Sequence, residues 1–196
     1  MTLIRLAFLY IHLLACCVAI GMTIVNDIML IRRILTGDVS DRRRADLDNL
    51  QSTIMIALIL LWTTGISVTA FDVFADGLHV FENPKLQAKI LVCLALTING
   101  IVLHHQVFPV LQKAGSILKL EHFRLKLALI TGTISGISWL YVAFLGIARP
   151  LAWKYSLFEM LIAYPLLIMM AYMSFRWTLD WSRKRTENLI SQFAKE

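Results

Sequence analysis

The stretch KLQAKILVCLALTINGIVLHHQVFPV, residues Lys85 to Val110, decides the fold class. At about 1.5 Å per helical residue it is long enough to cross the roughly 30 Å of hydrocarbon in a bilayer. It nevertheless carries Lys89, Asn99 and the adjacent pair His104 and His105. Ionisable groups inside a membrane usually face the protein interior and have partners there. These residues are therefore candidates for a functional site.

Four further apolar runs of similar length occur in this chain of 196 residues, of which 58% are hydrophobic, and the mean hydropathy is +0.70. Both values are well above those of a typical soluble domain. The first run continues past Cys17 without a polar break, so we expect a retained membrane helix and not a signal peptide. The sequence predicts an all-α, single-domain bundle of five transmembrane helices at residues 6–31, 53–71, 86–110, 125–147 and 155–177, with a tail at 178–196.

The distribution of basic residues predicts the orientation of this bundle. The 19 lysines and arginines split 14 to 5 between the two sides. The larger group lies in the connections after the first and third helices, at the start of the fourth helix, at the end of the fifth and in the tail. Basic residues gather in cytoplasmic loops, so we expect the N-terminus outside and the C-terminus in the cytoplasm. The net charge of +6 then needs no nucleic-acid partner, and the expected partner is the lipid bilayer. Acidic residues interleaved with the arginines favour a solvated loop with a short surface helix from Asp41.

Polar and small residues recur at helical spacing on one face of the first helix and one face of the third. Because both helices run in the same direction, sequence number measures depth, and two polar layers follow. We expect an outer layer of His12, Lys89 and Glu159 with Asp72 nearby, and an inner layer of Asn26, Asp27 and His104. Cys16, Cys93 and Asn99 complete this predicted seam between the first and third helices.

Each seam residue also has an ordinary structural interpretation, and the sequence leaves both open. Lys89 lies about one turn inside its helix and can extend its ammonium to the surface. Asp27 can pair with Arg32, Arg33 or His104 near the cytoplasmic side. The cysteines can be small buried apolar side chains, and no disulfide or zinc spacing is present.

The fourth predicted helix contains TGTISGIS, in which Gly132 and Gly136 form a GxxxG pattern. Small residues at this spacing let two helices approach closely, either within the chain or across a homodimer or another membrane-protein partner. Pro165 is expected to bend the fifth helix, since it removes one backbone donor.

No signature of soluble-type hydrolysis or nucleotide chemistry occurs in the sequence, which has no GxSxG, HExxH, Walker or Rossmann pattern. Catalytic residues therefore remain unknown. The chemistry that remains is that of histidines in a membrane: binding a haem iron or copper, relaying protons or lining a pathway.

Three short motifs carry a resemblance to known families: His12, the TTG that ends at Gly65, and PKLQAK from Pro84 to Lys89. Together they resemble the copper-resistance D domain and the haem-containing, oxygen-independent protoporphyrinogen oxidases. The resemblance implies a multi-pass protein of the bacterial inner membrane, with b-type haem as the expected cofactor ahead of copper. Gln87 and Asn99 stand where the oxidases usually carry histidines, so whether the chain is an enzyme stays open.

Geometry limits how a haem could be held. His12 and His104 differ in depth by about 15 Å, so they cannot both ligate one iron or one metal ion. His104 could instead pair with Met169 or Met173, or His12 could be the sole ligand with Lys89 meeting a propionate. The first hypothesis is a haem-binding redox protein. The alternatives are a metal or proton transport protein that uses the same seam, and a non-catalytic subunit of a larger complex.

Overall fold

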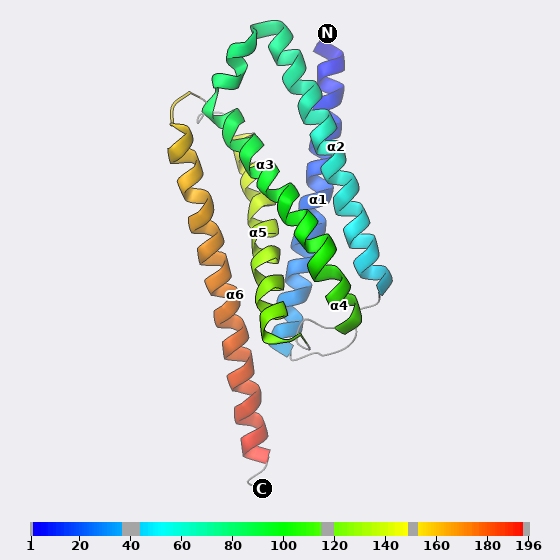
Figure 1. Cartoon of the computed structure of the whole chain (residues 1–196), viewed down its shortest axis with the longest axis vertical. Coiled ribbons are helices and arrows are strands. Elements are labelled where there is room, and N and C mark those ends of the chain that lie inside the picture. The colour runs from blue at the N-terminus through cyan, green and yellow to red at the C-terminus, as the bar shows by residue number, and fades with distance from the viewer. Residues whose placement is uncertain (1, 37–43, 115–119, 149–152, 194–196) are drawn as a thin grey trace.

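The computed structural model describes residues 2–36, 44–114, 120–148 and 153–193, and every regular element in these ranges is a helix (Figure 1). Five helical stretches of the described chain are long and apolar enough to cross a membrane, as the sequence predicts. The third crossing consists of three consecutive elements. The elements are α1 (Thr2–Thr36), α2 (Arg44–Asp76), η1 (Leu78–Glu82), α3 (Pro84–Val102), η2 (Leu103–Val107), α4 (Phe108–Ala114), α5 (His122–Ile147) and α6 (Leu157–Phe193).

The helix ends follow from local sequence. Gly77 ends α2 with a φ of 83°, a left-handed conformation that glycine adopts without strain, and its N–H donates to the Val73 carbonyl. Asn83 caps α3 by accepting a hydrogen bond from the Lys85 N–H at 3.0 Å. Pro84 follows as the first residue of α3, where its missing N–H costs nothing.

The second and third crossings differ from their predicted bounds. The acidic and basic segment from Arg44 onward is the start of α2 itself and not a separate surface helix, and Asp41 lies outside the described residues. The third crossing changes to a π-helical turn at Leu103–Val107, in which the Phe108 N–H donates to the Leu103 carbonyl. Pro109 has no N–H to continue the regular pattern, which favours a wider turn just before it.

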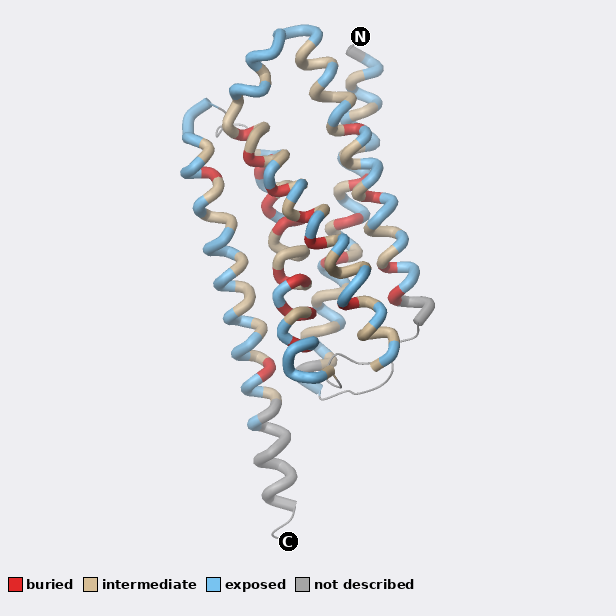
Figure 2. Tube along the Cα trace, viewed as in Figure 1, coloured by how far each residue is buried: buried red, intermediate tan, exposed pale blue. Residues whose placement is uncertain are grey.

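The helices pack in pairs: α1 runs along α2, α3 along α5, and α5 along α6. Small and apolar residues fill the contacts, such as Ala19 and Ala57 with Leu96 and Trp139. Figure 2 shows buried residues concentrated on the central helices α3 and α5, whereas the described part of α6 has only two buried residues, Met160 and Leu179. Large apolar side chains such as Ile66 and Phe144 point outward, as expected of a surface that meets lipid.

Polar side chains join the helices across these contacts. The Trp62 indole donates to the Thr97 hydroxyl at 3.0 Å and links α2 to α3. The Asn99 amide donates to the Thr131 carbonyl at 2.9 Å and links α3 to α5. Ser138 bonds the Tyr164 hydroxyl at 2.8 Å and links α5 to α6. In a membrane, such bonds and close packing replace the hydrophobic effect in holding helices together.

Candidate functional site

His12 lies on α1 and is half-buried, and its ring is held by α2. The imidazole Nδ1 lies 2.8 Å from the hydroxyl oxygen of Thr64, a buried residue. That hydroxyl donates its single hydrogen to the Leu60 carbonyl at 2.5 Å. With the hydroxyl hydrogen assigned to this short bond, Thr64 accepts from His12, so Nδ1 carries a hydrogen and Nε2 of the neutral ring presents its lone pair.

Gly65 explains how the ring fits against α2. A Cβ atom placed on Gly65 would lie 3.5 Å from Cε1 of His12, in ordinary contact with the ring. The TTG motif thus supplies both the hydrogen-bond partner of His12 and the flat surface beside it. The sequence contained the signal for this partner, but sequence number compares depth only between helices that run in the same direction, and the second helix runs opposite to the first.

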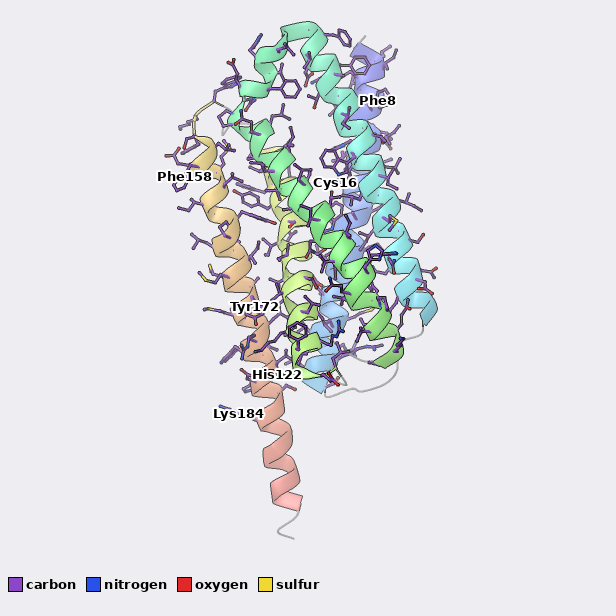
Figure 3. The ribbon with its side chains drawn as sticks, viewed as in Figure 1. Phe8, Cys16, His122, Phe158, Tyr172 and Lys184 are labelled. Carbon is purple, nitrogen blue, oxygen red and sulfur yellow. The ribbon has the colours of Figure 1, made fainter. Side chains whose placement is uncertain are left out.

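Lys89 and two cysteines surround the same region from α1 and α3. The Lys89 ammonium lies close enough to His12, Cys16 and Cys93 to act on each of them electrostatically. Cys16 lies midway along the bundle (Figure 3), and both cysteines are free thiols. Among the described residues, Lys89 forms no ion pair with a carboxylate. We call His12, Cys16, Thr64, Lys89 and Cys93 the His12 cluster.

The cluster differs from the predicted seam because α1 and α3 make few direct contacts. Their main neighbours are α2 and α5 respectively, so the cluster is completed by α2 and is not a packed interface of two helices. The short connection between α1 and α2 favours this antiparallel pairing.

Two acidic residues expected near the outer layer have other partners. Glu159 is exposed at the start of α6, where its carboxylate accepts from the Ser156 N–H at 2.8 Å and from the Ser156 hydroxyl at 3.0 Å. It caps a helix and does not join His12. Asp72 forms an ion pair with Arg5 at 2.8 Å.

His104, the histidine of the predicted inner layer, has different partners from His12. The Gln51 amide nitrogen bonds Nδ1 of His104, and the His105 ring stands edge-on against it with centroids 4.8 Å apart. Gln51 and Thr64 are 13 positions apart on α2, which places His104 about 20 Å from His12 along that helix. Met173 is 63% exposed on α6 and Met169 is 51% exposed. The structure therefore brings neither His104 nor these methionines to the His12 cluster.

Asn99 and Asp27 also face α5. Asn99 is buried and its amide nitrogen donates to the Thr131 carbonyl, so it contributes to the packing of α3 against α5. The Asp27 carboxylate lies against the α5 backbone, with Oδ2 3.0 Å from the position of a Cβ on Gly136. Within the described chain it forms no ion pair with Arg32, Arg33 or His104.

The two glycines of the GxxxG pattern on α5 have different surroundings. Gly136 admits the Asp27 side chain, so its small size serves a contact within the chain. Gly132 has open space where a Cβ would stand. A homodimer or partner contact through these glycines stays a prediction.

The His12 cluster can offer one imidazole lone pair, two thiols and one ammonium to a ligand. In the ranges that the structure describes, no three His, Cys, Asp or Glu side chains are grouped as for a metal ion. Comparison with protein-family models, with curated proteins and with solved structures found no match to this chain. The family resemblance therefore stays a prediction, and a function has to be argued from the residues.

Proposed function

We propose that this chain is a membrane redox protein that binds b-type haem, with His12 as the axial ligand. The observation that supports the proposal is the hydrogen bond from His12 Nδ1 to Thr64, which leaves the Nε2 lone pair free. Metal-binding histidines commonly donate their other ring hydrogen to a fixed acceptor, which sets the orientation of the ring. A porphyrin supplies four ligands of its iron, so one imidazole from the protein is sufficient.

Lys89 supports the same proposal, because its positive charge is opposite to that of a haem propionate. A cation without a carboxylate partner in the described part of a membrane protein favours an anionic ligand. A haem propionate has this charge, and Lys89 acts electrostatically on His12. Bound haem would supply one-electron transfer, while the chain holds the imidazole, neutralises a propionate and keeps lipid around the site.

The visible absorption spectrum of the purified protein tests this function. We expect a Soret band, and sharper bands on reduction, when haem is supplied during expression. His12→Leu should lose the bands, whereas His105→Leu should keep them because His105 is exposed at the far end of the third crossing. A colourless protein that takes up no added hemin, or an unchanged spectrum in His12→Leu, would refute the proposal.

A second candidate is transport of a metal or a proton, which a colourless protein would favour. Its support is the presence of polar side chains at several depths of the bundle: His12, Asp27 and His104. Uptake of copper or protons by vesicles containing the protein would then depend on these residues. A non-catalytic role in a larger complex predicts neither colour nor uptake.

The expected setting is the bacterial inner membrane, with the N-terminus outside. The five apolar helices support a multi-pass membrane protein. The split of basic residues supports the orientation. In this orientation the His12 cluster lies in the outer half of the membrane.

A further inference from the structure

A small cavity lies between α1 and α5, away from the His12 cluster. Its volume is about 50 Å³, which gives room for one or two water molecules. Its walls combine an acidic, a hydroxyl and an indole side chain with apolar residues. The lining residues are Ile20, Thr23, Ile24, Asp27, Gly136, Trp139 and Leu140.

Trp139, which lines this cavity, carries an unsatisfied hydrogen-bond donor. The residue is 2% exposed, and its Nε1 has no hydrogen-bond partner within the described structure. A buried N–H without an acceptor costs about 1–3 kcal/mol, so such groups usually bond to an ordered water. The cavity that Trp139 lines has the volume for one.

Asp27 faces the same part of α5. Its Oδ2 lies against Gly136, which is one turn before Trp139 on the helix. The carboxyl group and the unsatisfied indole therefore line one space from opposite helices. A water between them could donate to Asp27 and accept from Trp139.

Two further polar side chains of α1 lie near Asp27. Asn26 bonds it on its own helix, and the Thr23 hydroxyl donates to the Ala19 carbonyl at 2.9 Å, which leaves its oxygen lone pairs for the cavity. The helices packed against α1 are α2, α5 and α6, and none of their described residues forms an ion pair with Asp27. An unpaired carboxylate in a membrane is costly.

We propose that Asp27, Thr23 and Trp139 form a hydrated proton-binding site. A hydronium ion delivers the proton to a carboxylate oxygen of Asp27 and becomes a water, which then bridges the carboxyl group to the Trp139 N–H. A metal cation suits this cavity poorly, because Trp139 offers a hydrogen and no lone pair. The site does not depend on haem at His12.

Infrared difference spectroscopy of the purified protein between two pH values tests the site. We expect the carbonyl band of a protonated carboxyl group, present in the wild type and absent in Asp27→Asn. Trp139→Phe should shift this band, since it removes the indole donor and keeps an aromatic ring. Asp48→Asn is the matched control and should keep the band, because Asp48 is exposed at the start of α2.

Three results would overturn the proposal: no band that depends on Asp27, a band unchanged by Trp139→Phe, or a band that responds to Na⁺ at constant pH instead of to pH. If Asp27→Asn fails to fold, the shift in Trp139→Phe still decides whether the indole and the carboxyl group share a water. The Soret band should be unaffected by Asp27→Asn, so this site and the proposed haem site can fail separately.

Discussion

At the scale of single residues, two neighbouring threonines show how a partner sets the chemistry of a histidine. Thr63 is exposed and bonds carbonyls of its own helix at Ile59 and Leu60, both at 3.0 Å. Thr64 is buried and also accepts from His12. Only the second threonine affects which ring nitrogen of His12 is free.

Thr64→Val should weaken haem binding while keeping the shape of the side chain. Loss of the acceptor for Nδ1–H leaves the ring orientation and the tautomer unset, and we expect affinity to fall about 10- to 100-fold. Titration of the purified protein with hemin measures this. Thr63→Val is the control and should bind as the wild type does. Equal affinities in the two variants would mean that Thr64 has no role at the site.

Gly136→Ala should be less stable than Gly132→Ala. A methyl group at 136 would stand 3.0 Å from Oδ2 of Asp27, and the shift that this contact forces has a cost that offsets the helix propensity alanine gains over glycine. Position 132 has open space, and alanine is favoured in helices by about 1 kcal/mol. Thermal unfolding in detergent, followed by circular dichroism, measures both.

A second substitution, at Asp27, tests whether the cost of Gly136→Ala comes from the contact with the Asp27 carboxylate. In an Asp27→Ala background, Gly136→Ala should lose this cost and become as favourable as Gly132→Ala, because the clashing oxygen is gone. A cost that persists would place the clash elsewhere on α1.

At the scale of elements, the start of α6 shows why Glu159 does not join His12 as the sequence predicts. The sequence Ser156-Leu157-Phe158-Glu159 is a capping box: the serine hydroxyl accepts from the Glu159 N–H at 3.3 Å, and the Glu159 carboxylate accepts from the Ser156 N–H. Depth alone assigned Glu159 to the outer layer. The local SxxE pattern was the stronger signal.

Ser156→Ala and Glu159→Ala should therefore lower stability without affecting a cofactor. We expect Ser156→Ala to cost about 1 kcal/mol, the usual effect of losing a helix cap, and Glu159→Ala to change stability in the same direction. Ser174→Ala is the control, since Ser174 is exposed and bonds only a carbonyl of its own helix among the described residues. Loss of the Soret band in Glu159→Ala would contradict this expectation and would show that Glu159 affects haem binding.

At the scale of the whole molecule, the five crossings were predictable because hydrophobic length alone defines them. The start of α3 at Pro84 was equally predictable from its cap. The partners of His12 and Asp27 were not, because they depend on which helices pack together and on how each helix is rotated about its axis. Spacing within one helix shows a shared face but does not show which neighbour that face meets.

The orientation of the molecule can be measured with introduced cysteines in a variant whose three natural cysteines are replaced by alanine. Figure 1 shows that α2 ends and α6 begins at the end of the bundle where α1 begins, whereas α4 ends and α6 extends at the other end. By these bounds, cysteines at positions 76 and 154 probe the first end, and cysteines at positions 113 and 184 probe the other. From the split of basic residues, an impermeant thiol reagent added outside should label the first two only. The reverse pattern would place the His12 cluster in the inner half.

The last helix is one unbroken rod that continues through Pro165 and extends past the other helices (Figure 1). Its 37 residues give a length of about 55 Å. A rod of this length acts as a lever: a 10° change of tilt within the membrane would swing its end sideways by about 10 Å. Small rearrangements where α6 meets α5, at Ser138 and Tyr164, would thereby be amplified into a displacement that a distance probe near Lys184 could register.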